Sequence, residues 1–174
     1  MRIAVLSGST RSASLNTRVA RLVAAARPQD EVVVDAALDR LPFYDGDLED
    51  AGWPPPVAAL RDLVAGSDVV VVVTPEYNGT IPGLLGNALD WLSRPHRDSP
   101  LQGRPVLVVT ATAGRGGGRS AAAHLVAVLE RIGARVSPSP LSLPLAGERL
   151  QDPALREALD AAVAQAASCA LPAA

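Results

Sequence analysis

A hydroxyl-rich loop near the N-terminus has the composition of an anion site. It covers residues 7–16, Ser-Gly-Ser-Thr-Arg-Ser-Ala-Ser-Leu-Asn, and leads directly into a segment with helical spacing. Free backbone N–H groups and the positive end of the helix dipole favour a dianion there, and the loop's side chains can add hydrogen bonds. Serine and asparagine also cap helices, and the loop alone leaves that alternative open. The candidate binding residues are Ser9, Arg11, Ser14, Leu15 and Asn16.

The same loop does not match the common nucleotide-binding motifs. It lacks the second glycine and the lysine of a Walker motif, and the chain contains no lysine at all. It also lacks the Gly-x-Gly-x-x-Gly pattern of dinucleotide-binding folds. A monophosphate therefore fits this loop better than a longer phosphate chain.

A second segment, residues 74–83, combines two prolines, two glycines and one tyrosine in Thr-Pro-Glu-Tyr-Asn-Gly-Thr-Ile-Pro-Gly. Such a turn supplies a flat surface and exposed backbone groups, which the ring system of a flavin requires. The candidate binding residues are Pro75, Glu76, Tyr77, Asn78 and Gly79.

A third segment, residues 110–118, is rich in glycine and opens another helix. Its backbone can approach the outer edge of a flavin or an incoming nicotinamide, although a flexible turn without a ligand is an open alternative. The candidate binding residues are Thr110, Thr112, Gly114 and Gly117. Arg115 and Arg119 are suited to the 2′-phosphate of NADPH, but solvated arginines are the simpler interpretation.

Strand-like and helix-like segments alternate along the chain and place these loops. β-Branched runs predict buried strands at residues 3–6, 32–34, 69–73 and 106–109, with a last strand between 135 and 143. Helical spacing appears in segments 15–26, 57–64, 84–89 and 125–132, and a final helix is expected from Pro153. The pattern predicts a single α/β domain over residues 1–174, a flavodoxin-like doubly wound five-stranded parallel sheet of order 2-1-3-4-5 with helices on both faces. Ligands of such sheets bind outside the carboxyl ends of the strands, where all three loops lie.

Two proline-rich segments, Pro42 to Pro56 and Ser137 to Gly147, are expected to be ordered surface loops.

Composition excludes several function classes. A net charge of -2 argues against a nucleic-acid partner, and the longest apolar runs are far too short to cross a membrane as a helix. The single cysteine, Cys169, cannot form an internal disulfide, and the chain shows no signal-peptide layout, so we expect a cytoplasmic protein. His96 and His124 have no metal-like spacing with each other or with Cys169, and no metal site is expected.

Two motifs together resemble the NADPH-dependent FMN reductase family of flavodoxin-like quinone, chromate and azo reductases. They are Gly8-Ser-x-Arg-x-x-Ser-x-Asn16 and Pro75-Glu-Tyr-Asn-Gly-x-x-Pro-Gly83, the latter followed by Asn87-Ala-Leu-Asp-Trp91. The resemblance implies that the first loop holds the phosphate of FMN and that the second borders the isoalloxazine ring, with Tyr77 beside the ring. The family often has lysine where this chain has Gly86, so any contact of that lysine is missing or replaced here.

The resemblance implies an enzyme whose flavin carries the chemistry, without a catalytic side chain. It takes hydride from NADPH or NADH and passes electrons to a small acceptor: a quinone, an azo compound, a metal oxyanion or free flavin. Glu76 and Asp90 are expected to cap or pair within the protein rather than transfer protons. The competing hypotheses are a non-enzymatic flavodoxin-type electron carrier and, less well supported, a flavin-free interaction domain.

Relatives in this family are commonly oligomeric, which implies a homodimer or homotetramer. The apolar residues Ile81, Leu84, Leu85 and Trp91 can form the subunit contact, or they can face this chain's own core.

Overall fold

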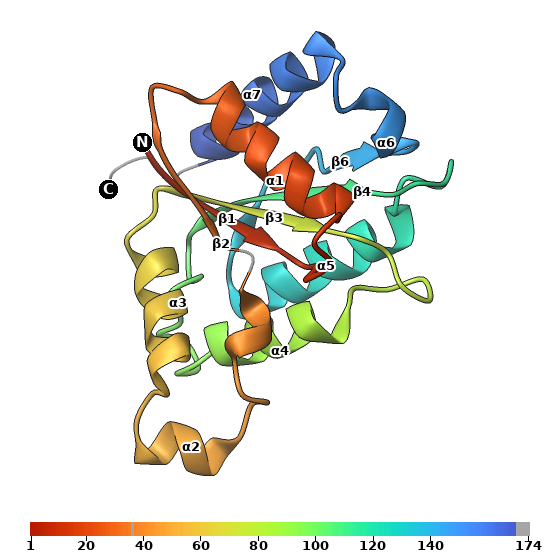
Figure 1. Ribbon diagram of the computed structural model, residues 1–174. Helices are drawn as coiled ribbons and strands as arrows, with labels where there is room; N and C mark the ends of the chain where they lie inside the picture. The colour runs from red at the N-terminus through yellow and green to blue at the C-terminus, as the bar shows by residue number, and fades with distance from the viewer. Residues whose placement is uncertain (36, 170–174) are drawn as a thin grey trace.

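The valine-rich runs form the centre of a parallel sheet (Figure 1). The computed structural model describes residues 1–35 and 37–169. The strands run in the order β2-β1-β3-β4-β5, and β6 also pairs with β4. This confirms the predicted strand order. The strands are β1 (Arg2–Ser7), β2 (Glu31–Asp35), β3 (Val69–Thr74), β4 (Pro105–Ala111), β5 (Arg135–Val136) and β6 (Leu141–Leu143).

Helices cover both faces of this sheet, as predicted. In Figure 1, α1 and α7 lie on one face, whereas α3, α4 and α5 lie on the other. The longer helices are α1 (Leu15–Ala26), α3 (Pro55–Ala65), α4 (Gly83–Leu92), α5 (Arg119–Ile132) and α7 (Pro153–Ser168); the short ones are η1 (Leu38–Arg40), α2 (Gly46–Ala51) and α6 (Ala146–Arg149).

Alternate residues of each central strand enter opposite hydrophobic cores. In β1, Ile3 and Val5 pack in the core beneath α1 and α7, while Ala4 and Leu6 pack in the core beneath α3, α4 and α5. Because side chains alternate across a strand, one continuous apolar run supplies both cores. This burial on both faces fixes the ends of β1, β3 and β4 at one edge of the sheet.

The last predicted strand is divided in two. Residues 135–143 form β5 and β6, which both pair with β4. Pro138 and Pro140 lie between them and lack the backbone N–H that a continuous ladder needs. The range predicted to hold the last strand therefore holds two short strands.

The two segments expected to be loops contain regular structure. Residues 42–56 include α2 and the start of α3, and residues 137–147 include β6 and the start of α6. Helix α2 begins at the cap residue Asp45, whose carboxylate accepts from the Asp47 N–H at 2.9 Å. It buries none of its residues, so no apolar periodicity marks it in the sequence.

Within the described part of the chain, no helix combines the length and apolar character needed to span a membrane.

Candidate functional site

The loops after β1, β3 and β4 meet around a cavity of about 360 Å³. This volume lies within the range of small-ligand sites. The lining residues come from these three loops and from the start of α1: Ser9, Arg11, Ala13, Ser14, Leu15, Asn16, Pro75, Glu76, Tyr77, Ala111, Thr112 and Ala113. The sheet topology thus brings together residues that lie more than a hundred positions apart, such as Ser9 and Ala113.

Ser14 begins helix α1 and is its N-cap. Its Oγ accepts a hydrogen bond from the Thr17 N–H at 3.2 Å, so the helix-capping alternative is right for this residue. The hydroxyl proton of Ser14 is still available to a ligand, because capping uses only the oxygen as acceptor. The carbonyl of Ser9 accepts from the Thr17 hydroxyl at 3.3 Å, which fixes the loop against the same helical turn.

Asn16 joins the first loop to β4. Its Nδ2 donates to the carbonyl oxygen of Ala111 at 3.1 Å. Its Oδ1 is buried and has no hydrogen-bond partner among the described residues. An unsatisfied buried acceptor costs about 1–3 kcal/mol. A ligand that brings an O–H donor to this point, such as a ribityl hydroxyl, would satisfy Asn16.

Arg11 supplies an available positive charge at the cavity. Its side chain is exposed, and it forms no ion pair with any residue of segments 1–35 and 37–169. The first turn of α1 contains no acidic residue that would oppose an anion. Together with the positive end of the helix dipole, this arrangement suits a phosphate.

The turn after β3 is closed on itself by two backbone hydrogen bonds. The Tyr77 N–H donates to the Thr80 carbonyl at 2.9 Å, and the Thr80 N–H donates to the Tyr77 carbonyl at 3.0 Å. Asn78 and Gly79 form the tip with φ values of 54° and 76°, which glycine and asparagine tolerate best. The Tyr77 side chain is 47% exposed and is available to pack on a planar ring.

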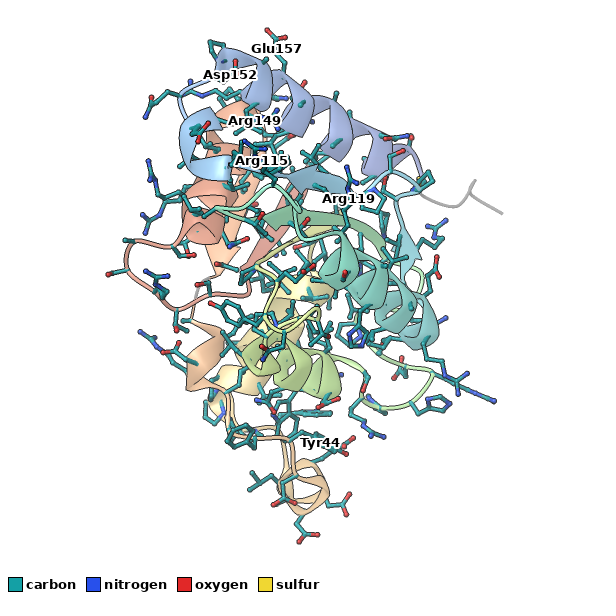
Figure 2. The ribbon with its side chains drawn as sticks, turned by 90° about the vertical axis from the view of Figure 1, so that its right-hand side faces the viewer. Tyr44, Arg115, Arg119, Arg149, Asp152 and Glu157 are labelled. Carbon is teal, nitrogen blue, oxygen red and sulfur yellow. The ribbon has the colours of Figure 1, made fainter. Side chains whose placement is uncertain are left out.

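Two threonine hydroxyls, one of them the buried Thr110, form hydrogen bonds to the glycine-rich loop after β4. The Thr110 hydroxyl donates to the Gly117 carbonyl at 2.6 Å, and the Thr112 hydroxyl donates to the Gly114 carbonyl at 3.0 Å. Of these four candidates only Thr112 lines the cavity. The other three shape the loop. Arg115 and Arg119 are exposed on this side of the molecule (Figure 2).

The cavity therefore gathers nine of the predicted binding residues: Ser9, Arg11, Ser14, Leu15, Asn16, Pro75, Glu76, Tyr77 and Thr112. Asn78, Gly79, Thr110, Gly114 and Gly117 do not line it. Sequence reasoning missed Ala13, Ala111 and Ala113, which line it with backbone and methyl groups. Alanine carries no functional group, so only its place in the predicted loops could have indicated a role.

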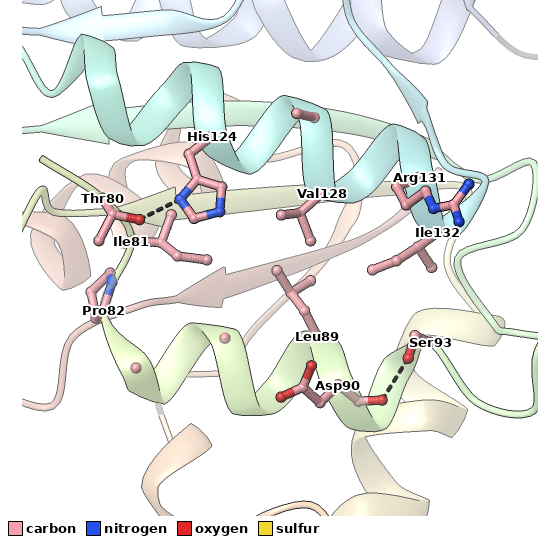
Figure 3. A pocket seen from close by; sticks show the side chains of 13 residues that line it. Thr80, Ile81, Pro82, Leu89, Asp90, Ser93, His124, Val128, Arg131 and Ile132 are labelled. Carbon is pink, nitrogen blue, oxygen red and sulfur yellow. Dashed lines mark hydrogen bonds between the residues drawn. The ribbon is translucent and has the colours of Figure 1, made fainter.

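A larger cavity, of about 510 Å³, lies between α4 and α5. Figure 3 shows that Ile81, Leu89, Val128 and Ile132 give it a largely apolar lining. No residue of the loops after β1 and β4 lines it, and its arginine, Arg131, lies in the last turn of α5 and not at a helix N-terminus. It is not the candidate site.

Two of the four proposed subunit-contact residues face the protein's own core. Leu85 and Trp91 are fully buried, and the Trp91 indole N–H donates to the Pro42 carbonyl at 2.8 Å. Ile81 and Leu84 are partly buried against the same core. The four residues therefore do not form an exposed patch.

The two acidic residues of this region behave differently. Glu76 accepts a hydrogen bond from the Ala121 N–H at 3.0 Å, which confirms the expected internal partner. The Asp90 carboxylate has no hydrogen-bond or ion-pair partner in the described segments and lies at the α4–α5 cavity, so the same expectation is wrong for Asp90.

Within the described segments, no group of three or more His, Cys, Asp or Glu side chains could hold a metal ion.

Comparison with known proteins gives consistent similarities. The model of the family described as NADPH-dependent FMN reductase matches residues 1–147. A quinone reductase of Escherichia coli strain K12 is 38% identical over 162 residues, which cover 92% of this chain and 86% of that protein. A 2-hydroxy-1,4-benzoquinone reductase of a Burkholderia species is 37% identical over 125 residues, covering 72% of this chain and 68% of the relative.

Among solved structures, the chain is similar to FerB, a flavoenzyme NAD(P)H:(acceptor) oxidoreductase from Paracoccus denitrificans. The TM-score is 0.82 at 28% sequence identity, and the match covers 98% of this chain and 99% of that one.

Proposed function

This chain belongs to the NADPH-dependent FMN reductase family, and on that premise we propose that its cavity after β1, β3 and β4 binds FMN for the reduction of quinones by NAD(P)H. The protein is an oxidoreductase that uses FMN and NAD(P)H. The observation that carries the assignment of the site is the convergence of Arg11, Asn16 and the start of α1 with the exposed Tyr77 turn in one cavity.

The residues present fit FMN in two parts. At one end, Arg11, the Ser14 hydroxyl and the N-terminus of α1 would bind the phosphate, and the unsatisfied Asn16 Oδ1 would accept from a ribityl hydroxyl. At the other end, Pro75, Glu76, Tyr77 and Thr112 would border the ring.

When bound, FMN supplies the redox chemistry, because its ring accepts hydride from a nicotinamide and returns electrons to an acceptor. The protein orients the reactants. We assign no side chain a proton-transfer role, since Glu76 is engaged by the Ala121 N–H and no second carboxylate lines the cavity. The candidate residues Asn78, Gly79, Thr110, Gly114 and Gly117 would act by shaping the two loops that enclose the ring.

The visible spectrum of the purified protein with FMN, before and after anaerobic addition of NADPH or NADH, tests this function. We expect bound flavin that bleaches rapidly and is reoxidised by a quinone. Bound flavin that stays oxidised would instead support an electron carrier. If the protein binds no FMN, the assignment of the cavity is wrong.

The acceptor is the finer part of the proposal. We favour a quinone because the relative from Escherichia coli is named a quinone reductase and the one from Burkholderia a 2-hydroxy-1,4-benzoquinone reductase. Steady-state rates with a benzoquinone, an azo dye, chromate and free FMN rank the four acceptor classes. A kcat/KM for chromate, azo dye or free FMN above that for the quinone would contradict this choice.

We also propose that the chain is a cytoplasmic, single-domain protein that forms a homodimer or homotetramer. The support for assembly is Phe43, which is 86% exposed next to α2, and the apolar α4–α5 cavity. A second copy of the chain would cover this apolar surface. Sedimentation of the wild type and Phe43→Ser tests it: we expect an oligomer that the substitution weakens, and a monomeric wild type would refute it.

A further inference from the structure

Helix α5 begins without a capping side chain of its own. Its N-cap is Gly118, in the left-handed conformation, and no neighbouring side chain along the chain accepts from the first turn. The first N–H groups of a helix need acceptors from elsewhere. Glu76, 45 residues earlier, supplies one: its Oε2 accepts from the Ala121 N–H at 3.0 Å.

The turn that carries Glu76 has a second attachment to the same helix. The hydroxyl of Thr80 and Nδ1 of His124 form a hydrogen bond, seen in Figure 3. Ala121 and His124 are three residues apart and therefore lie on one face of α5. Helix α5 thus holds the turn at both ends, on either side of the exposed tip at Asn78 and Gly79.

The start of α5 is itself fixed in position. The Thr110 hydroxyl holds the Gly117 carbonyl, and a Cβ added to Gly118 would lie 2.8 Å from the Cβ of Thr110, so this glycine packs directly on β4. Glu76 consequently connects the loop after β3 to the first turn of α5, the helix that follows the loop after β4. Together with the bond between Thr80 and His124, it holds the turn on this helix.

We propose that Glu76 is a positioning residue: its carboxylate, bound to the N-terminus of α5, sets the turn that borders the flavin ring. This inference rests on the proposed function. The charge is suited to the role because an anionic acceptor at a helix N-terminus forms a stronger hydrogen bond than a neutral one and interacts favourably with the dipole. A carboxylate that only stabilised α5 would leave the properties of bound flavin unchanged.

Asp152 provides a matched control. It caps α7 by accepting from the Ala154 N–H at 3.0 Å, a contact of the same kind and length, and it does not line the cavity. Figure 2 shows it near one end of the molecule, opposite to Tyr44. Asp152→Ala should lower Tm in the same way as Glu76→Ala without altering flavin binding.

The experiment measures Tm, the Kd for FMN and the visible circular dichroism of bound FMN in wild type, Glu76→Ala, Glu76→Gln and Asp152→Ala. We expect the Kd to rise about tenfold in Glu76→Ala, with an altered dichroism spectrum, because the turn is no longer held by Ala121 and binding must then order it. Glu76→Gln should recover most of this loss, since its amide oxygen still accepts from Ala121.

A lower Tm for Glu76→Ala with unchanged Kd and dichroism would overturn the inference. If Glu76→Ala does not fold, Glu76→Asp, whose carboxylate is one methylene shorter, takes its place, and an unchanged Kd and dichroism spectrum there would have the same meaning. Failure of the proposed function is distinguishable, because in that case the wild type itself would bind no FMN.

Discussion

The side-chain amide of Asn16 donates a 3.1 Å hydrogen bond to the carbonyl oxygen of Ala111, which joins the first turn of α1 to the end of β4. The two residues are 95 positions apart in the sequence. Asn16 therefore performs two tasks: it holds two walls of the cavity together, and it presents a buried, unpartnered Oδ1 at the site.

Replacement of Asn16 by alanine should weaken both stability and cofactor binding. Loss of the bond to Ala111 leaves a carbonyl without its partner, whereas removal of the unpartnered Oδ1 acts in the opposite direction, so we expect the free energy of unfolding to fall by about 1 kcal/mol. The Kd for FMN should rise at the same time. Urea denaturation and a fluorescence titration with FMN measure the two effects; a stability loss with unchanged FMN affinity would exclude a contact between Asn16 and the ligand.

Replacement of Arg11 should affect binding alone. Because this arginine is exposed and forms no ion pair in the described protein, Arg11→Ala should change the unfolding free energy by less than about 0.5 kcal/mol. Loss of a charged contact to phosphate should weaken FMN binding by about 1.5–3 kcal/mol, or roughly tenfold to a hundredfold. Arg21→Ala, an exposed arginine of α1 outside the cavity, is the control and should bind FMN normally. An equal rise in the Kd for FMN in Arg11→Ala and Arg21→Ala would contradict a specific role for Arg11.

Gly118 should not tolerate a side chain. Its φ of +75° would strain the backbone of any residue with a side chain. An added Cβ would also clash with the Cβ of Thr110, at 2.8 Å. We expect Gly118→Ala to destabilise the protein by at least about 1–3 kcal/mol. Gly116 has open space around it, and Gly116→Ala should leave thermal stability nearly unchanged. Similar Tm values for the two variants would show that the loop is not fixed on Thr110.

Stability should depend on pH through Asp30. Its pKa is lowered chiefly by a hydrogen bond from the Met1 ammonium at 2.7 Å and also by Arg27 at 2.6 Å, while burial acts in the opposite direction. A carboxyl with a lowered pKa in the folded state stabilises the protein above its unfolded pKa of about 3.9, and this contribution is lost as pH falls through the folded value.

Asp30→Asn should therefore be less stable than wild type at pH 6, and the difference should shrink below about pH 4. Urea denaturation of both proteins at pH 6 and pH 3 measures it. A stability difference that is the same at both pH values would show that the charge of Asp30 is not the cause.

The sequence alone determined the strands and the main helices. Strands that are buried on both faces need continuous apolar runs, and helices that pack on the sheet carry apolar residues at helical spacing. Ile3 to Leu6, Val69 to Val73 and the helix that contains Leu125 were predicted for this reason. The phosphate-binding composition of residues 7–16 and the closed turn of residues 75–80 were visible for a related reason: special backbone conformations and anion contacts need particular residue types.

Only the tertiary structure decided how these parts meet. The bonds from Asn16 to Ala111 and from Glu76 to Ala121 end on backbone atoms, which every residue carries, so no residue type marks the partner in the sequence. The direction in which Trp91 points depended on Pro42, a distant segment, and α2 escaped prediction because it buries no apolar face. Local chemistry specified the elements and the kind of ligand, whereas the contacts that position the site arise from segments that meet only when the sheet has formed.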